Sequence, residues 1–483
     1  MTRRTIPIAL ALILLPAAIA VVHVTGAAEP PTPKRTGLPT VRDFGAVGDG
    51  EADDTAAVQR AVNARIGDVV LPRGVYRITR PIVIELDKVG WTSVVGCGTA
   101  RLVMAGPGPA LRFVGTHSGT ASPQTVKPDV WERQRTPLAD GFEIVGAHPE
   151  ACGIEAAGTM QLTVSRVTIR HTLHAIHLVR RNRNVVVAEC HLYENRGVGL
   201  YLDDVNLHQI NVAASHISYN AGGGIVVRAG NVRNLQVSGC DIEGNMAADG
   251  PPTANILIDS TGGDAGTAEV AIVGCTIQHT AGAPDSANVR YIGTDRAGRA
   301  FGHVTIADNV LSDVQTNVHI QKARGVAITG NTFWKGVRHN LLVEDSTNVV
   351  VGPNAFDRNP AYRDEKSADA ALLLRRCRDA TLTGLHVNGV RRAAAALAIE
   401  ACRRINITNC TILDSDAAGI LLEDTDHSRI SDCLIRNDRD DAGDWVPIRI
   451  SGGRGNMVAD CLLDRPPAIA DGTAQARGNV VAE

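Results

Sequence analysis

Aromatic side chains are scarce in this chain, where Phe, Trp and Tyr together make up 3% of 483 residues. Proteins that grip sugars or single-stranded bases by stacking use more of them, so any such binding must be mostly polar. An excess of positive charge is also missing, because 48 Lys and Arg stand against 51 Asp and Glu for a net charge of -3. A nucleic-acid partner is therefore not expected. The 48 glycines follow no Gly-X-Y period, which excludes collagen, and 44% apolar residues predict a folded core.

Long apolar runs are missing beyond the N-terminus. The single run of bilayer length, Ile6–Val24, follows Arg3 and Arg4 and precedes small residues, a pattern typical of a secretory signal peptide. We predict a signal peptide over residues 1–28 and a proline-rich linker over 29–39. The mature protein is then expected to be secreted, extracellular or periplasmic, with no membrane contact after signal cleavage. An uncleaved membrane anchor is the alternative.

The ten cysteines do not have the spacing of a disulfide framework, although export favours disulfides. Six of them occupy the same position of a recurring sequence pattern. In this pattern alternating branched residues are followed by two small or polar residues and then the cysteine, as in Leu235–Ile242 (LQVSGCDI). These six are Cys190, Cys240, Cys275, Cys410, Cys433 and Cys461. In other copies the same slot holds Val167, Ser215, Asn309, Asn331, Asn354 and Leu385. The slot recurs throughout residues 160–465, which identifies a repeat protein.

Each repeat is too short for a helix but accommodates two or three strands, so consecutive repeats must stack their strands in parallel. The predicted fold is all-β, a β-solenoid in which equivalent slots lie roughly 4.8 Å apart. The cysteine and asparagine slots are expected to form an interior ladder of free thiols and amides, with Cys377 and Cys402 in a second, shorter ladder. Because neighbouring coils bring α-carbons within bridging distance, oxidation of one such pair is the alternative.

Three N-terminal segments resemble the opening motif of the pectate-lyase-like right-handed parallel β-helix superfamily, of rhamnogalacturonase and epimerase type. They are Val41–Gly50 (VRDFGAVGDG), Asp53–Gln59 (DDTAAVQ) and Val69–Tyr76 (VVLPRGVY). The resemblance implies a single right-handed parallel β-helix domain over residues 40–483, with the cap motif at 40–100 and the coils at 160–465. Because that superfamily includes polygalacturonases, alginate epimerases and viral tailspikes, it implies an architecture and leaves the activity open.

The acidic residues of this motif are predicted to be structural. Asp53 or Asp54 can N-cap a helix from about Thr55 to Ala64. The helix is expected to cover the open end of the solenoid with an apolar face that consists of Ala57, Val58, Ala61 and Val62.

Function in a solenoid is normally built on one exposed sheet, where successive coils line a groove. In the second strand of each repeat the branched residues face inward, so the residues between them face outward. The outward candidates are His177, Tyr201, Asp203, Arg228, Asp259, His319, Gln321 and Glu344. Farther along, the same positions carry Arg375, Glu400, Glu423 and Arg449, interleaved with Leu342, Leu373, Ala398 and Leu421. We assign Arg228, His319, Gln321 and Glu344 to substrate binding and the other four candidates to catalysis.

Four insertions are expected to wall a cleft over Asp203, Arg228 and Asp259. They are Met246–Thr253, Gly262–Thr267, Asp295–Gly302 and Thr116–Asp140, the last with Trp131 as a lid or subsite. The alternative is that these loops only protect the edges of the coils.

Two constellations fit cleavage of a polysaccharide. Asp203 and Asp259 lie one coil either side of Arg228, about 10 Å apart between backbones, near the roughly 6.5 to 9.5 Å of an inverting glycosidase. Arg228 can keep one of these carboxylates ionised. His177, Tyr201 and Arg228 supply instead the base, the acid and the neutralising cation that β-elimination on a uronate requires. A self-neutralising Asp-Arg-Asp ladder and an ordinary surface His-Tyr pair are the respective alternatives.

We therefore expect a secreted protein that binds a polysaccharide or oligosaccharide and hydrolyses glycosidic bonds with two carboxylates. A polysaccharide lyase and a non-catalytic surface or adhesive module are the alternatives, because the Gly-His-Gly pattern of polygalacturonases and the Asp-Pro-His signature of alginate epimerases are absent. Cofactors are not expected and no metal site is assigned, with calcium as the alternative. The acidic residues that would hold calcium are Asp438, Asp440, Asp441 and Asp444, or the pair Asp203 and Asp204. The oligomeric state stays open.

Overall fold

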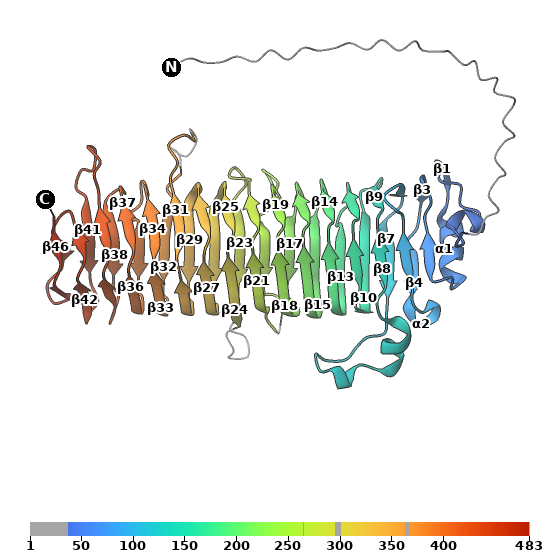
Figure 1. Cartoon of the computed structure of the whole chain (residues 1–483), viewed down its shortest axis with the longest axis horizontal. Helices are drawn as coiled ribbons and strands as arrows, with labels where there is room; N and C mark the ends of the chain where they lie inside the picture. Colours follow the sequence, from blue (N-terminus) through green and yellow to red (C-terminus); the bar gives the residue numbers. More distant parts are fainter. Residues whose placement is uncertain (1–36, 264, 295–300, 363–367, 483) are drawn as a thin grey trace, which may run out of the picture. The chain divides into compact units, whose positions relative to one another are not determined.

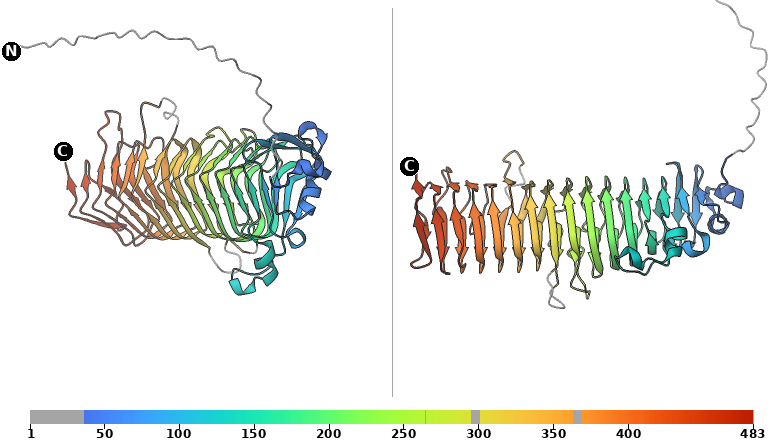
Figure 2. Two further views of the ribbon diagram at one scale, coloured as in Figure 1. Left: turned by 45° about the vertical axis from the view of Figure 1, so that its right-hand side comes forward. Right: turned by 60° about the horizontal axis from the view of Figure 1, so that its bottom comes forward.

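The computed structural model describes residues 37–482 except 264, 295–300 and 363–367. The predicted signal peptide and residues 29–36 of the predicted linker lie outside the described residues. Residues Pro39–Glu483 form one compact unit built mainly of parallel strands stacked coil on coil (Figures 1 and 2). None of the helices in the described ranges is long and apolar enough to cross a bilayer.

Each coil contributes strands to two sheets. The short sheet has 17 strands and the long sheet has 29. The strands of the short sheet are β1 Asp49–Asp53, β3 Gly74–Ile78, β6 Ala100–Met104, β9 Glu143–Gly146, β12 Thr168–Arg170, β14 His191–Tyr193, β16 His216–Ser218, β19 Asp241–Glu243, β22 Thr276–Gln278, β25 Val310–Ser312, β28 Thr332–Trp334, β31 Asn354–Asp357, β34 Leu385–Asn388, β37 Thr411–Leu413, β40 Leu434–Arg436, β43 Leu462–Leu463 and β46 Val480–Val481.

The long sheet bends along its length into two arms. Arm 1, which follows the short-sheet strand in each coil, consists of β4 Ile82–Glu85, β7 Gly108–Val114, β10 Ala151–Met160, β13 Ile176–Ala188, β15 Val198–Ala213, β17 Gly223–Arg228, β20 Ala254–Asp259, β23 Ala287–Ile292, β26 Val314–Gln321, β29 Gly336–Glu344, β32 Ala371–Arg375, β35 Leu397–Glu400, β38 Ala418–Glu423, β41 Val446–Ser451 and β44 Ala468–Ile469.

Arm 2 returns the chain to the short sheet. It consists of the second halves of β13 and β15 together with β2 Asp68–Val70, β5 Ser93–Val95, β8 Leu138–Asp140, β11 Thr163–Ser165, β18 Asn231–Ser238, β21 Ala268–Val273, β24 Gly302–Ala307, β27 Arg324–Thr329, β30 Thr347–Val351, β33 Arg378–Thr383, β36 Arg403–Thr408, β39 Arg429–Ser431, β42 Asn456–Ala459 and β45 Ala474–Arg477. The prediction of an all-β parallel solenoid is confirmed.

The predicted interior ladder of thiols and amides is confirmed. All ten cysteines are unpaired, and the slot residues bond from coil to coil. The Cys240 amide lies 3.5 Å from Cys275 Sγ, and the Cys275 amide donates to Asn309 Oδ1 at 2.9 Å. The second ladder is present too, because the Cys377 amide lies 3.2 Å from Cys402 Sγ. These polar slots therefore satisfy each other inside the apolar core.

A third ladder, made only of buried asparagines, was not predicted from the sequence. Each of the first six donates through Nδ2 to Oδ1 of the next, at 2.7 to 2.8 Å. Its members are Asn195, Asn220, Asn245, Asn255, Asn288, Asn317 and Asn340. This ladder runs where the chain passes from the short sheet to arm 1, so it anchors the edge from which arm 1 starts.

The predicted capping helix is confirmed as α1 (Thr55–Asn63), at the N-terminal end of the stack (Figure 1). Its buried face includes the four predicted apolar residues. The Asp53 carboxylate accepts the Thr55 amide at 3.0 Å and so caps the helix. Asp54 makes no capping bond and instead accepts the amides of Val47 and Gly48, at 2.7 and 3.0 Å. Both acids are therefore engaged in structural bonds. The remaining short helical segments are η1 Val41–Phe44, α2 Leu86–Val89, η2 Pro123–Thr125 and the π-helical η3 Val130–Gln134.

Candidate active site

The eight candidate residues lie in two columns on the outward face of arm 1. One column runs Glu155, His177, Tyr201, Val226, Leu257, Arg290, His319 and Leu342 on successive coils. The other runs Val179, Asp203, Arg228, Asp259, Ile292, Gln321, Glu344 and Arg375. The register partner of Tyr201 on the next coil is thus Val226, and Arg228 belongs to the column of Asp203. The candidates separate into two clusters, around His177 and around His319.

The first cluster is centred on a stacked pair, His177 and Tyr201. Their ring centroids are 5.1 Å apart and the planes differ by 6°. His177 Nε2 lies 3.2 Å from Asp203 Oδ2. Because an ionised carboxylate only accepts, Nε2–H donates, and the lone pair of the neutral ring lies on Nδ1. His177 is therefore oriented as a base by Asp203.

Tyr201 is held in its protonated form. Burial raises its pKa to about 12, and the negative charge of Asp203 adds to the rise, whereas Arg228 opposes it. At neutral pH the phenol is therefore a proton donor. Arg228 itself is exposed, one coil beyond Asp203, and carries a positive charge at the edge of the cluster.

His174 is a member of the cluster that the sequence analysis missed. Its ring lies 5.4 Å from that of His177 and 5.0 Å from that of Tyr201. Nδ1 accepts the Val198 amide at 3.1 Å. Burial lowers the pKa of His174 to about 4, and the charge of His177 contributes. His174 therefore packs against the pair as a neutral ring. The sequence signal that could have revealed it is the spacing of three residues between His174 and His177, where arm 1 begins.

Asp259 is close to Arg228 in register but engaged elsewhere. Its Oδ1 accepts the Thr261 amide at 3.0 Å and the Thr261 hydroxyl at 2.6 Å. This local turn fixes the carboxylate at the end of β20. By contrast, the Asp203 side chain is 39% exposed and faces His177. The structure thus gives the two carboxylates of the predicted hydrolytic pair different surroundings.

The second cluster repeats the histidine–carboxylate contact without a phenol. His319 Nε2 lies 3.2 Å from Glu344 Oε2, just as His177 faces Asp203. Leu342 stands where Tyr201 stands in the first cluster. Glu344 also pairs with Arg375 and Arg376, at 3.7 and 3.4 Å. Its charge is therefore compensated within the protein. Gln321 occupies the Glu344 column one coil earlier.

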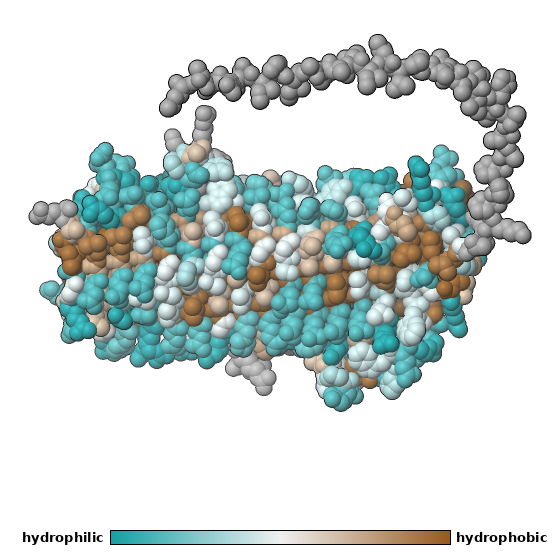
Figure 3. All heavy atoms as spheres, viewed as in Figure 1, coloured by the Kyte–Doolittle hydropathy of each residue, from teal (hydrophilic) through white to brown (hydrophobic). Residues whose placement is uncertain are grey.

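Beyond Leu342 the His177 column becomes apolar. Leu373, Ala398 and Leu421 follow on successive coils. They form an outer cluster with Leu342 and with Ala395, Ala418 and Val446. In Figure 3 an apolar band runs along this face of the stack. The chemically varied part of arm 1 is therefore its first half.

The predicted walls of the cleft are anchored by apolar contacts of their own. Trp131 packs with Val126, Val130 and Met160, so its ring fixes its own loop. Met246 packs against Ala283 and Val314. Residue 264 and residues 295–300, which belong to two further predicted walls, lie outside the described residues. A cleft over Asp203, Arg228 and Asp259 stays a prediction.

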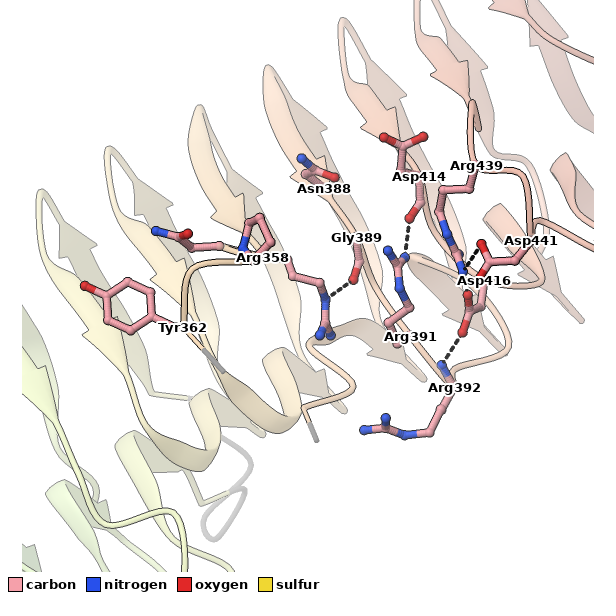
Figure 4. Close-up of a pocket in the computed structure, with 12 residues that line it drawn as sticks. Arg358, Tyr362, Asn388, Gly389, Arg391, Arg392, Asp414, Asp416, Arg439 and Asp441 are labelled. Atoms are coloured by element: carbon pink, nitrogen blue, oxygen red, sulfur yellow. Dashed lines mark hydrogen bonds and ion pairs between the residues drawn. The ribbon is translucent and has the colours of Figure 1, made fainter. Parts of the chain in front are cut away.

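A hollow of about 570 Å³ lies in the C-terminal half, among loops that lead from the short sheet to arm 1 (Figure 4). Arginines and aspartates line it. Arg439 bonds to Asp416 at 2.6 Å and to Asp441 at 2.7 Å. Arg391 donates to the Asp414 carbonyl. In this hollow Arg439 is therefore ion-paired, whereas Arg391 bonds to backbone carbonyls.

Two aspartates of the acidic loop considered for calcium are ion-paired with arginines. Asp438 pairs with Arg436 at 2.5 Å and Asp441 with Arg439. Across the part of the chain that the structure describes, no three His, Cys, Asp or Glu side chains are placed to hold a metal ion.

Three family models together match most of the chain. Residues 40–103 match a family described as "Rhamnogalacturonase A/epimerase, pectate lyase-like". Residues 143–277 match "Right handed beta helix region", and residues 268–459 match "Periplasmic copper-binding protein (NosD)". The chain belongs to the pectate-lyase-like right-handed parallel β-helix superfamily. The right-handed fold and the superfamily inferred from residues 41–76 are both confirmed.

Among curated proteins, this β-helix is similar over short segments to mannuronan C5-epimerases of Azotobacter vinelandii. It is 54% identical to AlgE5 over 43 residues, which are 8% of this chain and 4% of the epimerase. It is 54% identical to AlgE3 over 71 residues, which are 13% and 4% of the two chains. The chain thus spans a small fraction of the length of these relatives.

Solved structures with a similar arrangement have low sequence identity. Tailspike protein 3 of bacteriophage CBA120 gives a TM-score of 0.43 at 13% identity, with coverage of 91% of this β-helix and 61% of the tailspike. The A-module of Azotobacter vinelandii epimerase AlgE6 gives 0.40 at 15% identity, with coverage of 92% and 99%. PfbA, a surface adhesin of Streptococcus pneumoniae, gives 0.42 at 15% identity, with coverage of 88% and 92%.

Proposed function

We propose that this protein acts on an acidic polysaccharide and removes the proton beside a uronate carboxylate at the cluster of His177, Tyr201, Asp203 and Arg228. The observation that carries the proposal is the contact between an Asp-oriented histidine and a stacked, protonated tyrosine. The names of the matched family and relatives, rhamnogalacturonase, epimerase and mannuronan C5-epimerase, support a polysaccharide of this class.

Each residue has a role in β-elimination. Arg228 neutralises the uronate carboxylate, which makes the neighbouring C–H more acidic. His177 Nδ1 takes that proton, and Asp203 stabilises the resulting imidazolium. The electron pair forms a C=C bond, the glycosidic C–O bond breaks, and Tyr201 donates its proton to the leaving oxygen. Hydrolysis by Asp203 and Asp259 stays a prediction, and the elimination route is favoured because Oδ1 of Asp259 already accepts two hydrogen bonds from Thr261.

The proposal includes export. The predicted signal peptide over residues 1–28 and the match to a family described as periplasmic support a location outside the cytoplasm. The substrate would then be an extracellular or periplasmic polymer.

The test mixes purified protein with mannuronan, polygalacturonate and neutral polysaccharides, and follows absorbance of unsaturated products together with reducing ends. Elimination predicts that both rise on a uronate polymer. Tyr201→Phe and His177→Gln are expected to lower turnover by about 10² to 10⁴-fold. His319→Gln is the matched control, because His319 makes the same contact to a carboxylate without a phenol. It is expected to retain kcat, and a raised KM would agree with its predicted role in substrate binding.

Three other results would replace the proposal. Reducing ends without unsaturated products, lost in Asp203→Asn and Asp259→Asn, would establish hydrolysis. Incorporation of solvent deuterium into the polymer without cleavage would show that proton removal is followed by reprotonation, as in an epimerase. Binding without any chemical change would establish a non-catalytic module.

A further inference from the structure

The corner between arm 1 and arm 2 holds a second group of cationic side chains, on the same coils as the candidate active site. Arg183 in β13, His208 in β15 and Arg233 in β18 are register partners on successive coils. They therefore form one column, with neighbours about 4.8 Å apart between backbones.

A hollow of about 560 Å³ lies at this column. It is lined by Arg181, Asn206, His208, Asn231, Arg233 and the segment Ser118–Ala121. Arg181, Asn206 and Asn231 are themselves register partners and form a second column. The two columns and the backbone of Ser118–Ala121 line the hollow together.

The three arginines bond only to neutral acceptors. Arg183 Nη1 donates to the carbonyls of Thr120 and Ala121, at 3.0 and 2.5 Å. Arg181 donates through Nε to His117 Nε2 at 3.2 Å and through Nη1 to Asn206 Oδ1. Arg233 donates to the carbonyls of Val232 and Gly266, and it lies over the Phe301 ring. Two donor atoms, Arg181 Nη2 and His117 Nδ1, are buried and find no partner among the described residues.

Within the residues that the structure describes, the charge of this corner is therefore uncompensated. None of the three guanidinium groups forms an ion pair with a described residue, although the exposed Glu269 acts on Arg233 from a distance. Burial lowers the pKa of all three arginines, yet a guanidinium stays charged in proteins. Buried charges are normally paired, as Arg439 is in the hollow of Figure 4. A missing counter-ion is the simplest physical account of the corner.

We propose that this hollow binds an oxyanion, namely a carboxylate, sulfate or phosphate group. Arg181 and Arg233 supply the charge, and the Asn206 and Asn231 amides together with the loop backbone supply directed hydrogen bonds. The site is separate from the cluster of His177 and does not depend on its chemistry. Because Asn206 and Asn231 follow Asp203 and Arg228 by three residues, a polymer on arm 1 passes close to it.

The first test measures binding of inorganic sulfate, inorganic phosphate and glucuronate, by calorimetry and by thermal unfolding, against chloride at equal ionic strength. Wild-type protein is expected to bind these oxyanions, and Arg181→Gln and Arg233→Gln are expected to weaken binding at least about tenfold. Arg439→Gln controls for the general stabilising effect of sulfate, because Arg439 is ion-paired, and it should respond like wild type. Absence of an oxyanion response in wild type, or a full response in both hollow variants, would overturn the proposal.

A second variant tests the missing charge directly and does not risk an unfolded protein. Asn206→Asp keeps the acceptor for Arg181 and adds a carboxylate, so it is expected to raise the melting temperature without added anion and to suppress the oxyanion response. Asn388→Asp is the matched control, in the hollow where Arg439 is already paired with Asp416 and Asp441. If Asn206→Asp leaves both quantities at their wild-type values, the corner does not lack a counter-ion.

A third measurement identifies the kind of molecule that carries the acidic group. An oligouronate that binds more tightly than its neutral counterpart, with the difference lost in Arg233→Gln, assigns the group to a sugar polymer. A response to phosphate and sulfate alone assigns it to a free inorganic oxyanion. Tyr201→Phe is expected to retain either response, so failure of the proposed elimination chemistry leaves this test intact.

Discussion

Mild acid is expected to destabilise this protein through the buried His117. The residue is 3% exposed, and Nε2 accepts a hydrogen bond from Arg181 Nε, which only an unprotonated nitrogen can do. Burial lowers the pKa of His117 from 6.5 to about 4, and the charges of Arg181 and Arg183 contribute. Below pH 6.5 the unfolded chain therefore takes up a proton that the folded chain does not.

The size of the effect follows from the two pKa values. The contribution of His117 to the unfolding free energy is fully present above pH 6.5 and falls as the pH drops. It is lost by about pH 4, where the folded protein also binds the proton. At about 1.4 kcal/mol per pH unit, the loss due to His117 is about 2 kcal/mol at pH 5 and about 3 kcal/mol at pH 4.

Urea denaturation at pH 7 and pH 5 measures this loss. His117→Gln keeps an acceptor for Arg181 but does not titrate. Wild type is therefore expected to lose about 2 kcal/mol more than this variant between the two pH values. His303→Gln is the control, because His303 is exposed, and it should follow wild type. Equal losses in wild type and His117→Gln would refute the reasoning, since the titrating group would then lie elsewhere.

Three further outcomes are expected. Thiol titration of native protein should detect the exposed Cys97 quickly and Cys152 slowly, because burial raises the pKa of Cys152. Denatured, unreduced protein should show all ten thiols, and a smaller number would reveal a disulfide. Asn331→Leu should lower the unfolding free energy by about 3 to 6 kcal/mol in urea denaturation, because it leaves several buried ladder groups unpaired; a loss below 1 kcal/mol would contradict the ladder. Asp54→Ala should cost about 2 to 4 kcal/mol by the same measurement, because the Val47 and Gly48 amides lose their acceptor, and an unchanged midpoint would contradict this role.

The repeat and its interior could be predicted because a solenoid presents the same environment once per coil. A slot such as that of Cys275 or Asn309 meets its counterpart directly above and below, so periodicity in the sequence becomes contact in space. The ladder of Asn195 to Asn340 escaped prediction because only its first three members, Asn195, Asn220 and Asn245, keep a constant offset of five residues from the slots. Between Asn245 and Asn255 it moves across an inserted loop, from the end of a short-sheet strand to the start of arm 1.

The candidate site could be predicted only in part, because alternation assigns a face but not a partner. The contact between His177 and Asp203 joins two different columns on adjacent coils. A register shift between Val179 and Arg181, where the chain turns into arm 2, displaces the corner residues further. The sequence grouped His177 with Tyr201 and Arg228, whereas in the structure Asp203 also contacts His177. The charged corner could not be predicted for another reason. Its missing ion pairs depend on the distances between three arginines and the carboxylates of the folded chain, which no sequence pattern gives.

The two histidine clusters show that the stacking of coils alone can place a histidine beside a carboxylate. Stacked coils bring a histidine of one column next to a carboxylate of the other, and they do so at His177 and again at His319. The geometry of the pair is therefore a consequence of the fold. What distinguishes the first pair is the phenol of Tyr201 above the ring and a partly exposed carboxylate, where the second has Leu342 and a carboxylate held by two arginines. Reactivity on this face thus depends on the residues around the pair, and His319 is the internal reference against which His177 is to be measured.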